Sequence, residues 1–188
     1  SVKGSVVLKD FTKDKFKMNL TSNKVNVIGI LPGGVVTEKL TAEVNLDENG
    51  EFVWSPDIDI VKTAVLERHH GTGNVACGFL KGYGIKAGAV ALSIAHDSHN
   101  IIVVGVNDDE MECAVNALVA QEGGIVLVKD GKVIARAHNK RNSTNQVIDH
   151  AEILAIKKAN KYVDNWRLED CQIYITLEPC PMCASAIE

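Results

Sequence analysis

The sequence predicts an α/β protein with a β-rich first part, and three observations carry this prediction. Short β-branched or alternating runs, separated by glycine-rich turns, occupy the chain up to residue 106. From residue 108 onward the predicted order is helix, two strands, helix, strand, helix. The chain has 188 residues, 46% of them hydrophobic and 23% charged, which is typical of a globular protein with one domain or two small ones.

The first part is expected to consist of strands joined by tight turns. Asn49-Gly50 favours a hairpin between two short runs, and Pro32-Gly33-Gly34 predicts a turn. Glycine is dense between residues 71 and 88, which indicates tight turns or close backbone approach. Strands are predicted over residues 16–20, 25–31, 58–67, 89–95 and 101–106.

The second part begins with a helix over residues 108–121. Three acidic residues open it, an apolar stripe recurs at helical spacing, and Gly123-Gly124 ends it. Asp130-Gly131 predicts a type I′ turn between strands. The expected elements are strands 125–128 and 133–137, a polar loop 138–148, a helix 149–161, a strand 172–177, and a last helix opened by Pro179.

Composition excludes several classes of protein. No apolar run approaches the roughly 18 residues of a membrane span, and the charged N-terminus is unlike a signal peptide. Five cysteines are an odd number, so a full disulfide framework is not expected. These features predict a reducing compartment, a cytoplasmic location and no membrane partner. Cys77, Cys113 and Cys171 are expected to be buried thiols.

The chemistry-bearing residues gather near the C-terminus. His150-Ala151-Glu152 begins one predicted helix, and Cys180-Pro181-Met182-Cys183 begins another, directly after Pro179. Cysteines three residues apart at a helix start lie on one face and can chelate one ion. Neither short motif is specific alone, since a CxxC is often structural. Together, in this order, they form the H-x-E and P-C-x-x-C signature of the zinc nucleobase deaminases.

The ligand count favours a catalytic zinc ion over a structural one. His150, Cys180 and Cys183 supply three protein ligands and leave the fourth tetrahedral position for water. Zinc lowers the pKa of such a water to about 7. Glu152 is then placed to take the water proton and to deliver it to the substrate's ring nitrogen.

Residues 124–188 resemble the bacterial tRNA adenosine deaminases of the TadA type. The similarity is carried by VKDGKVIARAHN (128–139), DHAEILAI (149–156) and NWRLEDCQIYITLEPCPMCASAIE (165–188). It implies a cytidine deaminase-like fold, zinc on His150, Cys180 and Cys183, and Glu152 as acid and base. It also implies contact of Asn139 with the target base, a tRNA anticodon loop as partner, and homodimers. Residues 132–168 carry a net charge of +5, which fits either a phosphate partner or a solvated helix face.

Residues 68–134 resemble the C-terminal domain of bacterial adenine deaminase, of the amidohydrolase superfamily, and the similarity extends back to residue 1. Its most specific piece is AHDSHN (95–100). In that family a metal-binding barrel precedes this domain, and nothing in this sequence matches the barrel. His96, Asp97, His99 and Asn100 form a second candidate site. The two histidines could bind a metal, but their polar neighbours equally suit a hydrogen-bonded turn or a pocket lining.

The two resemblances predict two joined units, residues 1–123 and 124–188, which overlap in the hairpin 123–135. The second unit is expected to be incomplete, because the family continues beyond Glu188, and helix 108–121 stands where its first helix belongs. The leading hypothesis is zinc-dependent hydrolytic deamination of adenine to hypoxanthine as a base, above all adenosine to inosine in tRNA. One alternative is deamination of free adenine. Another is a truncated, chimeric zinc-binding chain without turnover.

Overall fold

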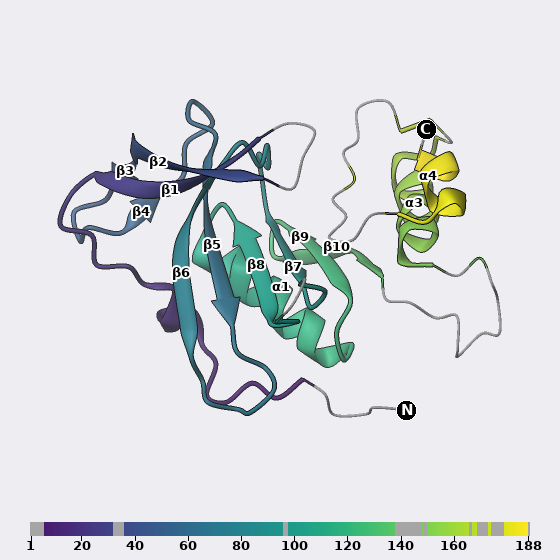
Figure 1. The fold of residues 1–188 in the computed structure, drawn as a ribbon, viewed down its shortest axis with the longest axis horizontal. Coiled ribbons are helices and arrows are strands. Elements are labelled where there is room, and N and C mark those ends of the chain that lie inside the picture. Colours follow the sequence, from purple (N-terminus) through teal and green to yellow (C-terminus); the bar gives the residue numbers. More distant parts are fainter. Residues whose placement is uncertain are drawn as a thin grey trace.

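A computed structural model (Figure 1) describes residues 6–31, 36–95, 98–137, 148, 150–165, 167–168, 173 and 179–187. The predicted turn at Pro32-Gly33-Gly34 lies outside these residues. So do the predicted loop after residue 137 and the predicted strand 172–177, apart from Ile148 and Ile173.

The fold is built around one eight-stranded mixed sheet. Its strand order is β10-β9-β7-β8-β5-β6-β1-β2, and every neighbouring pair is antiparallel except β1 with β6. The strands are β1 (Lys24–Ile30), β2 (Thr37–Glu43), β5 (Ile60–Leu66), β6 (Val75–Lys81), β7 (Ala89–Leu92), β8 (Ile101–Gly105), β9 (Ile125–Lys129) and β10 (Lys132–Ala137). A separate hairpin joins β3 (Asn45–Leu46) to β4 (Phe52–Val53) around Asn49-Gly50. The predicted α/β class is confirmed.

Residues 16–20 were expected to form a strand and do not. The short 3-10 helix η1 (Lys13–Phe16) ends there, and the segment continues as an extended chain outside both sheets. The side chains still alternate, because Phe16 is buried in one core cluster while Met18 and Leu20 pack against another. The alternating pattern therefore predicted correctly which side chains are buried. It did not predict whether a neighbouring strand is present to pair with this segment.

Strands β2 and β6 were not predicted. β2 carries a polar sequence on the edge of the sheet, so it lacks the apolar alternation that identifies half-buried strands. β6 lies within the glycine-rich stretch, where glycines at positive φ form the turns on either side of it. Its pairing with β5 over seven residues decides its conformation.

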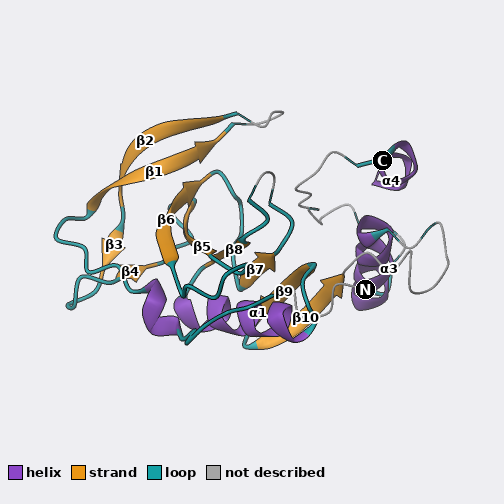
Figure 2. Ribbon diagram, turned by 60° about the horizontal axis from the view of Figure 1, so that its bottom comes forward, coloured by secondary structure: helices purple, strands orange, loops and turns teal. Residues whose placement is uncertain are grey.

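Helix α1 (Asp108–Ala120) covers one face of the sheet, against β7, β8 and β9 (Figure 2). The side chain of Asn107 caps its first turn by accepting a hydrogen bond from the Glu110 N–H. The predicted apolar stripe is confirmed, since Met111, Ala114, Val115 and Leu118 are all fully buried.

A buried lysine lies beside this core. Lys62, on β5, is only 2% exposed. Its ammonium group donates to the Asp108 carboxylate at 2.8 Å and to the Phe16 carbonyl at 3.0 Å. The lysine therefore ties η1, the sheet and the start of α1 together.

The β9–β10 hairpin is part of the same sheet as the strands of the first part. Asp130 and Gly131 both have positive φ, as the predicted type I′ turn requires. β9 pairs with β7 over four residues, with Ala89 opposite Val128. Gly88, just before β7, has a φ of +78° and lies directly against the Val128 carbonyl. The hairpin that both predicted units share thus continues the sheet of the first unit.

The remaining helices lie beyond the β10 end of the sheet. Helix α3 (Ala151–Val163) packs against β10 and against α4 (Pro181–Ile187), as Figure 1 shows. Both helices were predicted, and α3 extends to Val163. Within the described residues, none of the helices combines the length and the apolar character needed to cross a membrane.

Candidate metal centre

Two helix starts bring the candidate ligands together. The His150 carbonyl accepts the Leu154 N–H at 3.0 Å, and the Cys180 carbonyl accepts the Ala184 N–H at 2.9 Å. Each residue therefore stands at the beginning of its helix, with its side chain free of the helical hydrogen-bond pattern. Cys183 follows in the first turn of α4 and is fully buried.

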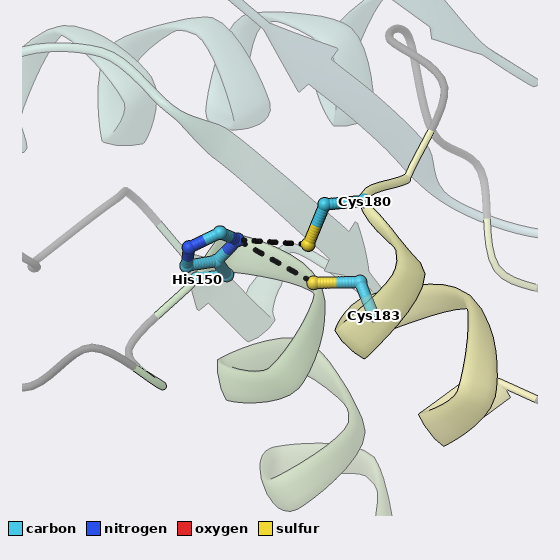
Figure 3. A group of neighbouring side chains, drawn as sticks. All are labelled: His150, Cys180 and Cys183. Carbon is cyan, nitrogen blue, oxygen red and sulfur yellow. Dashed lines mark hydrogen bonds between the residues drawn. The ribbon is translucent and has the colours of Figure 1, made fainter.

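The three side chains point toward one another (Figure 3). The His150 Nδ1 atom lies 3.6 Å from the Cys180 Sγ atom and 3.5 Å from the Cys183 Sγ atom. All three ligand atoms lie within 4.8 Å of one another. Among the described residues, this is the one group of three or more His, Cys, Asp or Glu side chains close enough to hold an ion.

These distances fit a tetrahedral metal ion. Zinc binds sulfur at about 2.3 Å and imidazole nitrogen at about 2.0–2.1 Å. A tetrahedral angle between those bonds places the nitrogen about 3.6 Å from each sulfur. The two observed separations, 3.6 and 3.5 Å, match that value closely. A donor set of two thiolates and one imidazole also favours zinc over magnesium and calcium, which prefer oxygen ligands.

The two thiols have different electrostatic environments. The pKa of Cys180 is lowered, mainly because the backbone N–H of Cys183 points at its sulfur. Burial raises the pKa of Cys183 to about 11, and the neighbouring Cys180 and Glu152 side chains act in the same direction. The Glu152 carboxylate raises the pKa of both thiols, so it lies beside the ligands without belonging to the cluster of three. A cation at this place would favour both thiolates.

Of the other predicted site residues, only His99 and Asn100 are described, and neither belongs to the cluster of three. Asn139, His96 and Asp97 lie outside the described residues. His99, at a φ of +49°, accepts a hydrogen bond at its carbonyl from Arg68, and no metal-binding group of three among the described residues includes His99 or the neighbouring loop. Asn100 is described, and its side-chain oxygen is buried without a hydrogen-bond partner.

Sequence reasoning missed the loop that holds residues 98–100. The His69 Nε2 atom lies 2.8 Å from the Ser98 carbonyl, and the Glu67 carboxylate accepts backbone N–H groups of His69, His70 and Thr72. One of these four contacts joins residues far apart in the sequence, and the other three involve backbone N–H groups. A pattern of residue types and spacings therefore does not predict them. The dense glycines at 71 and 73 were the only visible signal.

The thiols expected to be buried are only partly so. Cys77 and Cys113 are each half-buried, and their sulfurs lie 3.6 Å from the carbonyls of Lys15 and Gly131 respectively. Both lie at the margin of the core cluster under α1. Cys171 lies outside the described residues.

Comparison with known proteins gives two overlapping matches. Residues 34–138 match the adenine deaminase C-terminal domain, and residues 94–188 match the MafB19-like deaminase family. Each match covers more than half of the chain. The chain belongs to both families.

The two family regions share the stretch from β8 to β10. The adenine deaminase region contains the sheet from β2 onward, and the MafB19-like region contains α1, the hairpin and the whole metal centre. Helix α1 therefore lies inside the MafB19-like deaminase region, in front of the β9–β10 hairpin. The matched deaminase family is the MafB19-like one.

Several similar curated proteins are adenine deaminases. One from Desulfotalea psychrophila, "Adenine deaminase 2", is 57% identical over 134 residues, 71% of this chain and 23% of that protein. "Adenine deaminase" from Ligilactobacillus salivarius is 53% identical over 140 residues, 74% of this chain and 24% of that protein. "Adenine deaminase" from Brucella abortus is 44% identical over 135 residues. The chain spans about a quarter of the length of these relatives.

Proposed function

We propose that His150, Cys180 and Cys183 bind a catalytic zinc ion and that the chain deaminates adenine hydrolytically, giving hypoxanthine and ammonia. The observation that carries this proposal is the convergence of one imidazole and two thiols at distances that suit tetrahedral zinc. The MafB19-like deaminase region that contains the site supports the reaction class. The adenine deaminase relatives support the substrate.

Each of the three residues would supply one ligand atom to the ion. His150 would bind through the Nδ1 atom that faces both sulfurs. Cys180 and Cys183 would bind as thiolates, and Cys183 would be fixed by its complete burial in the first turn of α4. When bound, a zinc ion with three protein ligands activates a water molecule at the fourth position near neutral pH.

Glu152 is proposed to move the protons. It is two residues from His150 on the first turn of α3, and its carboxylate interacts with both thiols. From there a carboxylate oxygen can accept a proton from the attacking water and pass it to the ring nitrogen of the base. A second transfer to the exocyclic nitrogen lets ammonia leave as the C–N bond breaks. Water is the only co-reactant.

Free adenine is favoured over adenosine in tRNA as the substrate. The tRNA hypothesis depended on the TadA resemblance, whereas the three relatives described above are adenine deaminases. The positive charge of residues 132–168 remains compatible with an RNA partner, and tRNA is therefore the second substrate in the test.

The test is a metal and ammonia assay on the zinc-loaded chain with matched variants. We expect about one zinc per chain and ammonia release from free adenine. Glu152→Gln should keep zinc and lose about 10²–10⁴-fold in turnover, which is the usual contribution of a general acid–base. His150→Ala should lose zinc as well. The exposed Asn116, on α1 and outside the cluster of three ligands, supplies a control variant, Asn116→Ala, in which zinc binding and turnover should be unchanged.

Three outcomes would contradict parts of this proposal. Absence of zinc from the loaded chain would remove the metal centre. Full turnover by Glu152→Gln would remove the proposed role of that carboxylate. If inosine forms in an anticodon-loop RNA and no ammonia is released from free adenine, the substrate is tRNA and not the free base.

A further inference from the structure

We propose that Cys180 and Cys183 form a reversible oxidation site, at which a hydroperoxide converts the two thiolates into a disulfide and thereby releases the metal ion. The proposal rests on the metal centre of the proposed function and adds a regulatory reaction of the same residues. It does not depend on which base the enzyme deaminates.

The geometry of the pair permits a disulfide with little backbone movement. Cys180 immediately precedes α4 and Cys183 lies in its first turn, so the two are separated by one helical turn. Residues three apart across a helical turn have Cα atoms about 5 Å apart. Disulfides span about 4.4–6.8 Å between Cα atoms. The two sulfurs already lie within 4.8 Å of each other.

The two sulfurs differ in solvent exposure, and this difference indicates which of them reacts with the hydroperoxide first. Cys180 is only partly buried, whereas Cys183 is completely buried. A small hydroperoxide therefore reaches Cys180 first, and Cys183 stands behind it as the second sulfur. The half-buried Cys77 and Cys113 lie on β6 and α1, where their sulfurs approach backbone carbonyls, and neither joins the cluster around His150.

The reaction balances with the hydroperoxide as the only oxidant. The Cys180 thiolate attacks the peroxide, the O–O bond breaks, and a sulfenic acid and an alcohol form. The Cys183 thiolate then attacks the sulfenic sulfur, forming the S–S bond and expelling water. Two thiolates lose two electrons in total, the peroxide gains them, and two protons come from solvent. Two of the three metal ligands are consumed, so the ion held by His150 alone dissociates.

The experiment titrates the zinc-loaded full chain with hydrogen peroxide. Released zinc is followed with a chromogenic chelator, and intact mass reports the disulfide as the loss of two hydrogen atoms. We expect one disulfide for each zinc released, and recovery of bound zinc after treatment with dithiothreitol and added zinc. Cys113→Ser should behave like the unchanged chain. Cys183→Ser should stop at a sulfenic acid on Cys180 that dimedone traps.

Each result decides the proposal. Retained zinc and unchanged mass, or oxidation of Cys180 to a sulfinic acid without a disulfide, would overturn it. The metal-free chain is oxidised in parallel to separate this inference from the proposed function. If the chain forms the disulfide but never binds zinc, the proposed metal centre and the proposed metal release are both wrong, and only the reactivity of the thiol pair is supported. Zinc binding and turnover that resist peroxide would remove the oxidation site alone.

Discussion

The hairpin that the two family regions share is attached to the sheet beside the contact of Gly88 with β9, and Gly88→Ala tests this attachment. A Cβ atom at Gly88 would lie 1.9 Å from the Val128 oxygen and 3.0 Å from its carbonyl carbon. Both atoms belong to the backbone of β9, which pairs with β7 at Ala89 and Val128. An ordinary contact begins near 3.4 Å, so the two strands would have to separate.

The expected loss of stability has two parts. The positive φ of Gly88 costs an alanine about 1–2 kcal/mol. Forcing a methyl group against a fixed backbone adds about 1–3 kcal/mol. A total near 3 kcal/mol corresponds to a fall in Tm of about 6–12 °C for a chain of this size.

A second glycine supplies the matched control. Gly131 has a φ of +68°, and a Cβ atom there would meet nothing within 4 Å. Gly131→Ala therefore carries the φ cost alone, about 1 kcal/mol, and should lower Tm by about 2–4 °C. Thermal unfolding followed by circular dichroism measures both variants. Equal losses in the two variants would show that β7 and β9 do not pair as the structure has them.

Three further substitutions examine other parts of the fold. Asn107→Ala removes the side-chain cap of α1 and should cost about 1 kcal/mol in urea unfolding, whereas Asn116→Ala on the exposed face of the same helix should not. Lys62→Met leaves the acidic partner at the start of α1 uncompensated, and we expect a loss of about 2–4 kcal/mol; an unchanged urea midpoint would argue against the buried ion pair. The Glu67 carboxylate has its pKa lowered from 4.5 to about 2, first by the backbone N–H of Thr72. The contribution of this carboxylate to stability is thus complete above about pH 4.5 and lost as the pH falls toward 2. In Glu67→Gln the midpoint of unfolding should therefore depend less on pH between 4.5 and 2 than in the unchanged chain.

Much of the local structure followed from short-range signals. The stripe that begins at Met111 predicted α1, and Asp130-Gly131 predicted the turn between β9 and β10. These predictions succeed because a helix face or a two-residue turn is set by neighbours within a few positions. Where a strand depends on a distant partner the signal fails, as it did for the polar edge strand β2 and for the unpaired segment after Phe16.

The candidate site shows the same division. The spacing of Cys180 and Cys183 by itself places two thiols on one helical face, and His150-x-Glu152 places a ligand and a carboxylate on one turn. The sequence alone therefore predicted the donor set. It could not bring His150 to the cysteines, because 30 residues separate it from Cys180 along the chain. Only the packing of α3 against α4 closes that gap.

Tertiary structure also decided how the shared hairpin joins the rest of the sheet. Sequence patterns identified the hairpin that the families share, but not the strand that pairs with it. β9 pairs with β7 because the Gly88 backbone can approach Val128 as no larger residue could, and because α1 covers both strands with the same buried face. Local sequence therefore determined the helices, the tight turns and the donor atoms, while long-range burial and hydrogen bonding determined which elements meet. The reason is physical: pairing and packing depend on atoms that lie far apart in the chain and become neighbours only in the folded state.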